Sequence, residues 1–468
     1  MLALLALVGC AVDPPTPPPP PPPDILLVVL DTVRADHLST YGYGRPTSQQ
    51  LTALAASGVR FDDATAPATW TWPSHASLFT GAPPWVHGAR MNPSGAPDSG
   101  GTWTFGRLDP SLPTLAERLG AAGYRVEAHS SNTLLDPALG LTRGFDPARS
   151  HGNDDGATVA AALAAMRAED PRPLFLFVNL MSAHAPYMVA PGVPWSAPHA
   201  ATLADPPTWA APMLDDQDGG RGLDPTKTRD GARIDFLYQA GRHPIPAEGL
   251  SALSDLYDGD LVRLDAALQR LVGGWIETGR ATDVIAVTSD HGELLGEHGM
   301  LQHCCVPYPE LTGVPLVLAA PGRLPAGATI ATPVQLQQLY PTLLELAEVA
   351  EAPPGSLVAV AKGQPGPTPI QARAWPPSGW ARRGGRTATP WTLHREGSLA
   401  ALIPDQGEPQ LYDLSSDPGM TTNLRAARPA DVARLVAAAR AQVTDGPLVA
   451  LELGAEDAEM LQLLGYVE

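Results

Sequence analysis

The chain has 468 residues, of which 44% are hydrophobic, and this allows one large domain with a buried core plus a smaller one. Its formal net charge is −19, from 30 basic and 49 acidic side chains, which argues against a nucleic-acid-binding protein because such proteins are usually basic. The 52 prolines lie in clusters that mark linkers and loops, and the sequence shows no repeat of fixed period.

The first 23 residues look like a membrane anchor followed by a tether. Residues 4–9 are apolar, and residues 7–10 resemble the lipobox of a bacterial lipoprotein signal, in which Cys10 is lipidated. The stretch is too short to span a bilayer and lacks a basic start, so a start codon assigned too late and an accidental match are the alternatives. Residues 11–23 are mostly proline, which makes a stiff spacer. We therefore expect a signal over residues 1–10 and a lipoprotein of the bacterial cell envelope, periplasmic or surface-exposed.

Alternating strand and helix patterns predict an α/β fold. Apolar runs that are typical of strands buried on both faces of a parallel sheet occur at residues 25–30, 174–180, 283–288 and 313–318, and a further strand candidate covers 124–129. Helical periodicity predicts helices over residues 47–56, 112–119, 157–168, 250–276 and 334–350. Beyond residue 353, a small antiparallel sheet with a final helix is expected from candidates at 369–374, 386–393, 399–403 and 429–443.

Thr71 is a hydroxyl residue placed just before a predicted helix start. Pro73 follows it, and proline is favoured just inside a helix, so the stretch Ser74–Phe79 is expected to be helical. Thr71 would then lie where free backbone N–H groups and the helix dipole favour an anion. A hydroxyl in that place suits attack on a phosphate or sulfate ester. An ordinary helix cap is the alternative, because Ser and Thr are common at helix N-termini.

Polar residues stand at the ends of the predicted strands. Asp31 follows the first strand, and Asp290 and His291 follow the strand at residues 283–288. A parallel sheet brings such ends to one edge, where ligands bind, so these residues are expected to converge, and an aspartate there, such as Asp31, is a candidate metal ligand. Asn132 and His184 follow two other strands, and an imidazole there can donate a hydrogen bond to an anion or protonate a leaving group. A loop turn and a structurally satisfied histidine are the respective alternatives.

Two further stretches are informative about the site mouth and the cysteines. Residues 191–246 are rich in proline, aspartate and glycine and predict a long irregular excursion over the site, where substrate choice is expected to reside. Cys304 and Cys305 are adjacent, and two small buried residues are expected there, with a strained vicinal disulfide as the alternative.

Several of these blocks resemble the sulfatase family within the alkaline phosphatase superfamily. The stretch Thr71–Gly81 resembles the family signature C/S-x-P-S/A-R with its following small residues, and Asp31–Tyr43 and Ser289–Gly299 resemble the two metal-binding blocks. Together with shorter matches, the resemblance covers about residues 25–424. It implies an alkaline-phosphatase-like three-layer sandwich with a large, mostly parallel sheet flanked by helices. We expect a catalytic domain over 24–352 and a C-terminal subdomain over 353–468.

The resemblance also implies roles for single residues. The implied ligands of one divalent ion, Ca²⁺, Mn²⁺ or Zn²⁺, are Asp31, Thr71, Asp290 and His291. The implied catalytic residues are Thr71 as the nucleophile and His75, His184 and His303 as holders of the ester oxygens, with Asn132 as a substrate contact. His298 is the less favoured alternative to His303. From donor chemistry alone, a mixed carboxylate–imidazole set suits Zn²⁺ or Mn²⁺ better than Ca²⁺.

Three departures from the family pattern bear on the chemistry. The family's first signature residue is a Cys or Ser that is oxidised to formylglycine, and no formylglycine is expected from Thr71. His75 replaces the family's arginine, and Thr32 replaces a second aspartate of many members, which indicates fewer ligands. The first two departures resemble superfamily members that use an unmodified threonine, mostly phosphoryl-handling enzymes.

The sequence thus predicts a metal-dependent hydrolase of sulfate or phosphate esters. Its substrate is expected to be a small molecule or a glycan, and no nucleic acid is expected as a partner. One alternative is a phosphoryl-group transferase, although such enzymes usually carry several transmembrane helices, and the sequence has none. The other is a non-catalytic binding lipoprotein, which the missing Cys and Arg favour and the intact ligand set opposes.

Overall fold

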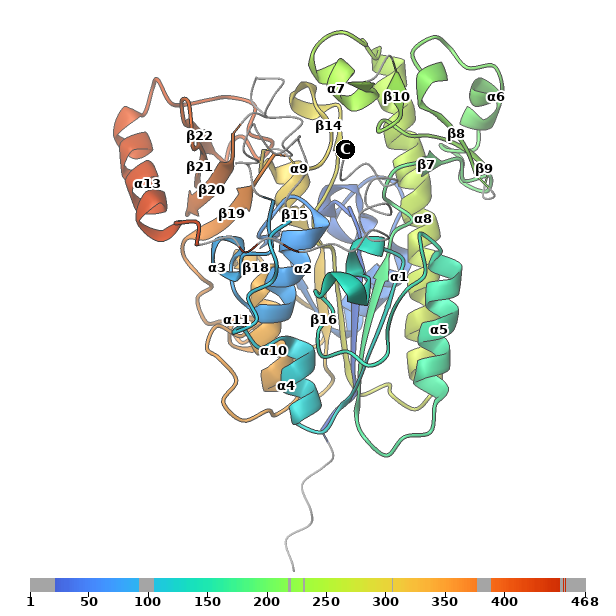
Figure 1. The fold of residues 1–468 in the computed structure, drawn as a ribbon, viewed down its shortest axis with the longest axis vertical. Helices are drawn as coiled ribbons and strands as arrows, with labels where there is room; N and C mark the ends of the chain where they lie inside the picture. The colour runs from blue at the N-terminus through green and yellow to red at the C-terminus, as the bar shows by residue number, and fades with distance from the viewer. Residues whose placement is uncertain are drawn as a thin grey trace, which may run out of the picture.

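An eight-stranded sheet forms the centre of the computed structural model, which describes residues 22–91, 105–217, 220–229, 232–304, 306–376, 389–446, 449 and 451 (Figure 1). Cys10 and most of the proline tether lie outside these residues. The strand order is β17-β2-β16-β12-β1-β6-β4-β5, and only β16 runs against the others. The strands are β1 (Ile25–Leu30), β2 (Val59–Phe61), β4 (Arg125–Ser130), β5 (Ala148–Ser150), β6 (Leu174–Leu180), β12 (Val284–Thr288), β16 (Leu316–Ala319) and β17 (Ala328–Ile330).

Helices cover both faces of this sheet, so the expected three-layer sandwich is confirmed. One face is covered by α1 (Gln49–Ser57), α5 (Asp155–Arg167) and α8 (Ala247–Glu277). The other is covered by α2 (Thr71–Thr80), α4 (Leu115–Ala121), α10 (Leu339–Leu346) and α11 (Leu357–Ala361). In β1, Leu27 packs into one layer and Leu26 into the other, because successive side chains of a strand point to opposite faces. Burial on both faces is why the strand reads as a continuous apolar run.

Two predicted helices differ from those observed. The helix expected over residues 334–350 is wrong in its first half, where β18 (Val334–Gln335) pairs with β3 (Ala64–Thr65) and a 3₁₀ turn, η7 (Leu336–Gln338), follows. Long-range strand pairing here overrides the helical periodicity of the sequence. In the signature stretch the helix begins at Thr71 itself, so Pro73 is its third residue rather than its first.

The sequence had suggested an irregular excursion at residues 191–246. This prediction is wrong, because the segment forms short helices and strands. It contains α6 (His199–Ala204), β8 (Leu214–Gln217), β9 (Gly220–Leu223), β10 (Thr228–Arg229), β11 (Ala232–Arg233) and α7 (Ile234–Gln239). Strand β9 pairs with β8 and with β7 (Tyr187–Met188), and apolar side chains such as Met213 and Leu223 join the core beside α8. The excursion lies above the carboxyl ends of the sheet strands (Figure 1).

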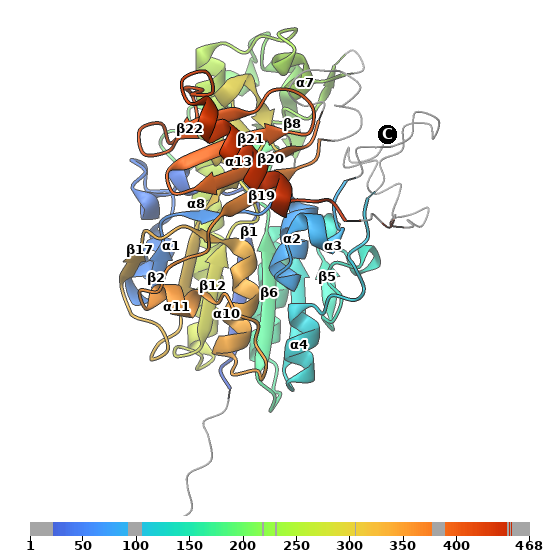
Figure 2. The same cartoon turned by 90° about the vertical axis from the view of Figure 1, so that its left-hand side faces the viewer.

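The chain ends in the small antiparallel sheet that the sequence predicted. Its strands are β19 (Ile370–Ala374), β20 (Trp391–Glu396), β21 (Leu399–Pro404) and β22 (Gln410–Asp413). Helix α13 (Pro429–Gln442) packs on it (Figure 2). The division into domains at residue 353 stays a prediction. Within the described part of the chain, no helix combines the length and hydrophobicity needed to cross a bilayer.

Candidate active site

The strand order places the polar strand ends side by side. Strand β1 lies between β12 and β6, and β4 lies next to β6, all four parallel. Asp31 directly follows β1, Asp290 and His291 follow β12, and Asn132 follows β4. Residues more than 100 positions apart therefore meet at one edge of the sheet, as the sequence suggested they would.

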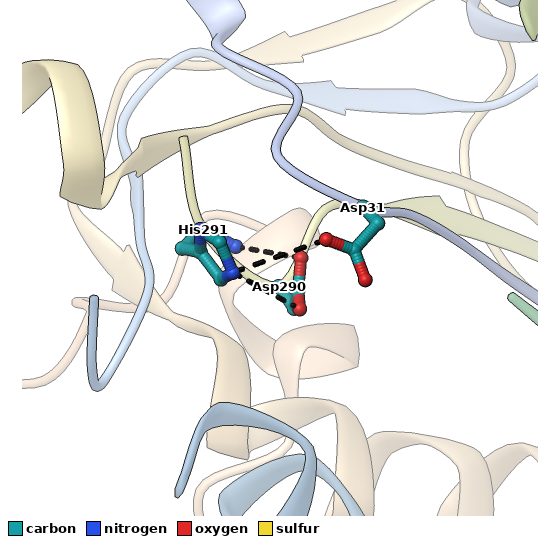
Figure 3. Close-up of side chains that lie close together, drawn as sticks. All are labelled: Asp31, Asp290 and His291. Atoms are coloured by element: carbon teal, nitrogen blue, oxygen red, sulfur yellow. Dashed lines mark hydrogen bonds and ion pairs between the residues drawn. The ribbon is translucent and has the colours of Figure 1, made fainter. Parts of the chain in front are cut away.

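Asp31, Asp290 and His291 form a compact, buried group (Figure 3). Nε2 of His291 lies 3.5 Å from Oδ2 of Asp290 and 3.9 Å from Oδ1 of Asp31. Nδ1 of His291 is 2.9 Å from the Gly292 carbonyl and donates to it, which leaves a lone pair on Nε2. One oxygen or nitrogen from each side chain thus faces a common point.

The facing atoms of this group lack the hydrogen bonds that buried polar atoms need. Oδ1 of Asp31, Oδ2 of Asp290 and Nε2 of His291 have no hydrogen-bond partner among the described residues. Burial raises the pKa of Asp290 to about 7, and burial with the nearby Asp290 charge raises the pKa of Asp31 to about 6. Burial lowers the pKa of His291 to about 3. Two carboxylates and a neutral imidazole, all buried, suit a divalent cation, which would give each of these three unpaired atoms a partner.

Neighbouring amides hold Asp31 in its orientation. Nδ2 of Asn132 donates to Oδ2 of Asp31 at 2.8 Å, and Nδ2 of Asn179 lies 3.5 Å from the same oxygen. Asn179 was not identified from the sequence, although it is the only polar residue in β6. The Thr32 hydroxyl donates to the Asp31 carbonyl at 2.7 Å. Among the described carboxylates and imidazoles, the group consists of Asp31, Asp290 and His291.

Thr71 lies in the same group, at the first position of α2. Its side chain is buried, with 1% of the residue exposed. Nδ2 of Asn132 donates to its Oγ1 at 3.3 Å, and its hydroxyl is among the donors that oppose the rise in the pKa of Asp290. Ser74 Oγ donates to the Asp290 carbonyl at 2.6 Å and so fixes α2 against the segment after β12. The first turn of α2 therefore presents a hydroxyl beside the carboxylate group.

His75 is buried against the first turn of α2. It is fully buried, and its Nδ1 lies 3.0 Å from the Thr71 carbonyl and 3.4 Å from Oδ2 of Asp290. Its ring packs against Phe79 and Phe177. Burial lowers the pKa of His75 to about 3, so the ring is neutral and does not supply an arginine's charge. Its Nδ1 supports the turn that carries Thr71, whereas its buried Nε2 has no hydrogen-bond partner among the described residues, and the role of His75 as a holder of ester oxygens stays a prediction.

A row of histidine rings extends from the group. The ring centroids of His291 and His303 are 4.6 Å apart, and those of His303 and His184 are 5.3 Å apart. Glu293 Oε1 accepts from Nδ1 of His303 at 3.1 Å, and burial raises the pKa of Glu293 to about 7. Glu293 was not selected from the sequence, although an acid two residues after His291 was a usable signal. Nε2 of His184 is buried and has no hydrogen-bond partner among the described residues.

The other histidine and the cysteines that were considered from the sequence, His298, Cys304 and Cys305, are not part of this row of histidine rings. His298 pairs with Glu310 at 3.2 Å and stacks on Tyr308, which leaves His303 as the histidine near the group. Cys304 is a free, buried thiol, as expected for a small buried residue. Cys305 lies outside the described residues.

Comparisons with known proteins agree with the fold and show the family. The family model described as Sulfatase matches residues 23–349. A delta 4,5-hexuronate-2-O-sulfatase of Bacteroides thetaiotaomicron is 23% identical over 447 residues, which cover 88% of this chain and 87% of that protein.

Two solved structures share the fold over most of their length. The phosphonate monoester hydrolase of Agrobacterium radiobacter has a TM-score of 0.67 at 22% identity, covering 90% of this chain and 96% of that chain. A protein in complex with its substrate D-glucosamine-2-N,6-O-disulfate has a TM-score of 0.66 at 18% identity, covering 91% and 99%. The family match over most of the chain and this alkaline-phosphatase-like fold establish that the chain belongs to the sulfatase family of ester hydrolases.

Proposed function

We propose that this protein hydrolyses sulfate or phosphate esters with Thr71 as the nucleophile. The observation that carries the proposal is the position of the Thr71 hydroxyl. It lies at the start of α2, receives a hydrogen bond from Asn132 and stands beside the buried group of Asp31, Asp290 and His291. A hydroxyl, an anion-binding helix end and a candidate cation site are the parts that displacement at an anionic ester requires.

The proposed reaction has two displacement steps, with Thr71 as the nucleophile in the first. Thr71 Oγ1 loses its proton and forms a bond to the sulfur or phosphorus atom, the bond to the leaving oxygen breaks, and that oxygen takes up one proton, so no net proton is gained or lost in this step. Water then attacks the same atom and releases sulfate or phosphate with the free Thr71 hydroxyl. His184 and His303 offer ring nitrogens for the ester oxygens, and Asn132 holds Oγ1 of Thr71 in place. A divalent cation bound by Asp31, Asp290 and His291, and reached by Thr71, would supply positive charge and lower the pKa of a nearby hydroxyl.

The relatives and the two replaced signature residues support the proposed substrate classes. The hexuronate sulfatase and the glucosamine disulfate complex support a sulfated glycan or a smaller sulfate ester. The phosphonate monoester hydrolase, the unmodified Thr71 and the neutral His75 keep phosphoryl esters as the second possibility.

Hydrolysis of simple chromogenic esters tests the proposed function. We expect purified protein lacking the first 23 residues, with added Mn²⁺, Zn²⁺ or Ca²⁺, to release p-nitrophenol from p-nitrophenyl sulfate, p-nitrophenyl phosphate or a phosphodiester. Release from the phosphoesters alone would show that the enzyme with Thr71 in the signature hydrolyses phosphate esters and not sulfate esters. Release from the sulfate would show that an unmodified threonine serves a sulfatase site.

The same assay separates the alternative functions. A transferase would turn over only when an acceptor alcohol is added, whereas a hydrolase needs water alone. A binding protein would turn over none of the esters. Absence of both bound metal and turnover would therefore favour the non-catalytic alternative, in which the fold is kept and the chemistry is lost.

We also propose that Cys10 is lipidated and anchors the protein to a membrane of the cell envelope. The described chain enters β1 at Ile25, and Asp31 lies at the opposite end of that strand, so Pro23, where the tether ends, and the candidate site are at opposite ends of β1. We expect the parent protein to incorporate labelled palmitate and to sediment with membranes, and Cys10→Ser to lose both properties. Equal label in parent and variant would contradict lipidation at Cys10.

A further inference from the structure

We propose that Arg233 binds a second anionic group of the substrate, separate from the ester that is cleaved. This inference rests on the proposed ester hydrolysis and narrows its substrates to esters of acidic molecules, such as sugars that carry a carboxylate or a further sulfate. Arg233 belongs to the excursion at residues 191–246, outside the signature stretch Thr71–Gly81.

The fold holds Arg233 close to the histidine row. It ends β11 and precedes α7, and α7 packs against β14 (Leu301–Gln302), which leads directly into His303 (Figure 1). The Arg233 guanidinium lies 5.2 Å from the ring centroid of Phe236. Phe236 in turn packs on the apolar cluster around Leu294 and Met300, on the hairpin between Glu293 and His303. The excursion and the hairpin of the site thus meet at this arginine.

The charge of Arg233 reaches the site. The Arg233 charge acts on the Cys304 thiol, next to His303, where it opposes the rise in the pKa of that thiol that burial causes. A cation at this place attracts an anion that lies beside the histidine row, because Coulomb attraction is stronger in a partly dry site than in water.

The guanidinium is held so that one of its edges stays available. Nε and Nη2 lie 3.2 and 2.8 Å from the two carboxylate oxygens of Asp235, a buried residue whose Oδ1 also accepts from the Phe236 N–H at 2.8 Å. Nη1 has no hydrogen-bond acceptor among the described residues, and 26% of the Arg233 side chain is exposed. Asp235 therefore fixes the plane, and the edge formed by Nη1 and the second Nη2 proton can bind an oxyanion in the bidentate way.

Arg221 provides a matched comparison within the same excursion. It also pairs with an acid through Nε and Nη2, at 2.6 and 3.2 Å from Asp216. Its Nη1, however, already donates to the Leu203 carbonyl at 2.8 Å. Both arginines pair with a carboxylate. Arg233 alone of the two keeps Nη1 without an acceptor among the described residues and lies beside the hairpin of the site, through Phe236.

Binding to protein that does not turn over tests the inference. Metal-loaded Thr71→Val protein is titrated by calorimetry with two ligand pairs. One is a 2-O-sulfated hexuronate disaccharide and its carboxyl-reduced form, and the other is glucosamine 6-sulfate with and without N-sulfation. We expect the acidic member of at least one pair to bind more tightly, and Arg233→Gln to abolish that preference by weakening the acidic member on the order of tenfold or more, as for the loss of a charge-assisted hydrogen bond. The pair that responds identifies the anion as carboxylate or sulfate.

Three further variants keep the test decisive. Arg233→Gln combined with Asp235→Asn avoids an unpaired buried carboxylate and should show the same loss of preference. Arg233→Lys keeps the charge and should restore part of it, and Arg221→Gln should change nothing. Equal loss for both members of each pair, no preference in the Thr71→Val protein, or no binding of any acidic ligand would overturn the proposal. Failure of the proposed hydrolysis would appear separately, as absence of p-nitrophenyl ester turnover by the parent.

Discussion

Replacement of Thr71 by valine is expected to reduce turnover by about 10⁴-fold or more, the scale seen when a catalytic nucleophile is removed. Valine has the shape of threonine but no hydroxyl, so in the buried site the variant replaces the reacting oxygen by a methyl group. Turnover of the chromogenic ester that the parent cleaves is the measurement, with the melting temperature as a check on folding.

Thr71→Ser is the matched control for this prediction. It keeps the hydroxyl at the start of α2 and its hydrogen bond from Asn132, so its activity should stay within about tenfold of the parent, a barrier change of ~1.4 kcal/mol. Undiminished turnover by Thr71→Val would remove Thr71 from the mechanism. Loss of activity in both variants with unchanged melting would show that the methyl group or the exact placement of the hydroxyl also matters.

Removal of the metal is expected to have the second large effect. Several kcal/mol of charge stabilisation correspond to about a thousandfold in rate, and chelation should remove this contribution reversibly. His291→Ala should lower both metal content and turnover, because Nε2 of His291 faces the two carboxylates with no other partner among the described residues. Metal content measured by emission spectroscopy, with turnover on the same samples, checks the prediction. Full activity in chelated, metal-free protein would contradict it.

The pH dependence of stability gives the metal prediction a second readout. In the metal-free protein the folded-state pKa of Asp290 is raised to about 7 from 3.8, so between these values the folded form binds more protons than the unfolded form. Stability of the metal-free protein therefore falls as the pH rises through this window. A bound cation favours the ionised carboxylates and reverses this trend. The rise in melting temperature on adding metal should thus be larger at pH 8 than at pH 5, and equal rises would contradict a metal site at Asp290.

The sequence alone determined the buried strands at the centre of the sheet and the polar residues that follow them. Strands buried on both faces must be apolar throughout, so β1, β6 and β12 were recognisable, and so was the end of β1 at Asp31. Parallel pairing then required the residues after these strands to converge, and Asp31, Asp290 and His291 do so.

Only the tertiary structure decided which neighbours surround these residues. The hydrogen bond from Asn132 to Asp31 joins residues that are 101 positions apart in the sequence. Where a helix was expected to start, at residue 334, the chain instead forms β18, which pairs with β3. Neither contact leaves a local periodic signal. Glu293 beside His303 and Arg233 beside the site hairpin likewise depend on how segments pack, because hydrogen bonds and charges act through space rather than along the chain. Local patterns specify each element and its burial, whereas the chemistry of the site comes from contacts that form only when the elements assemble.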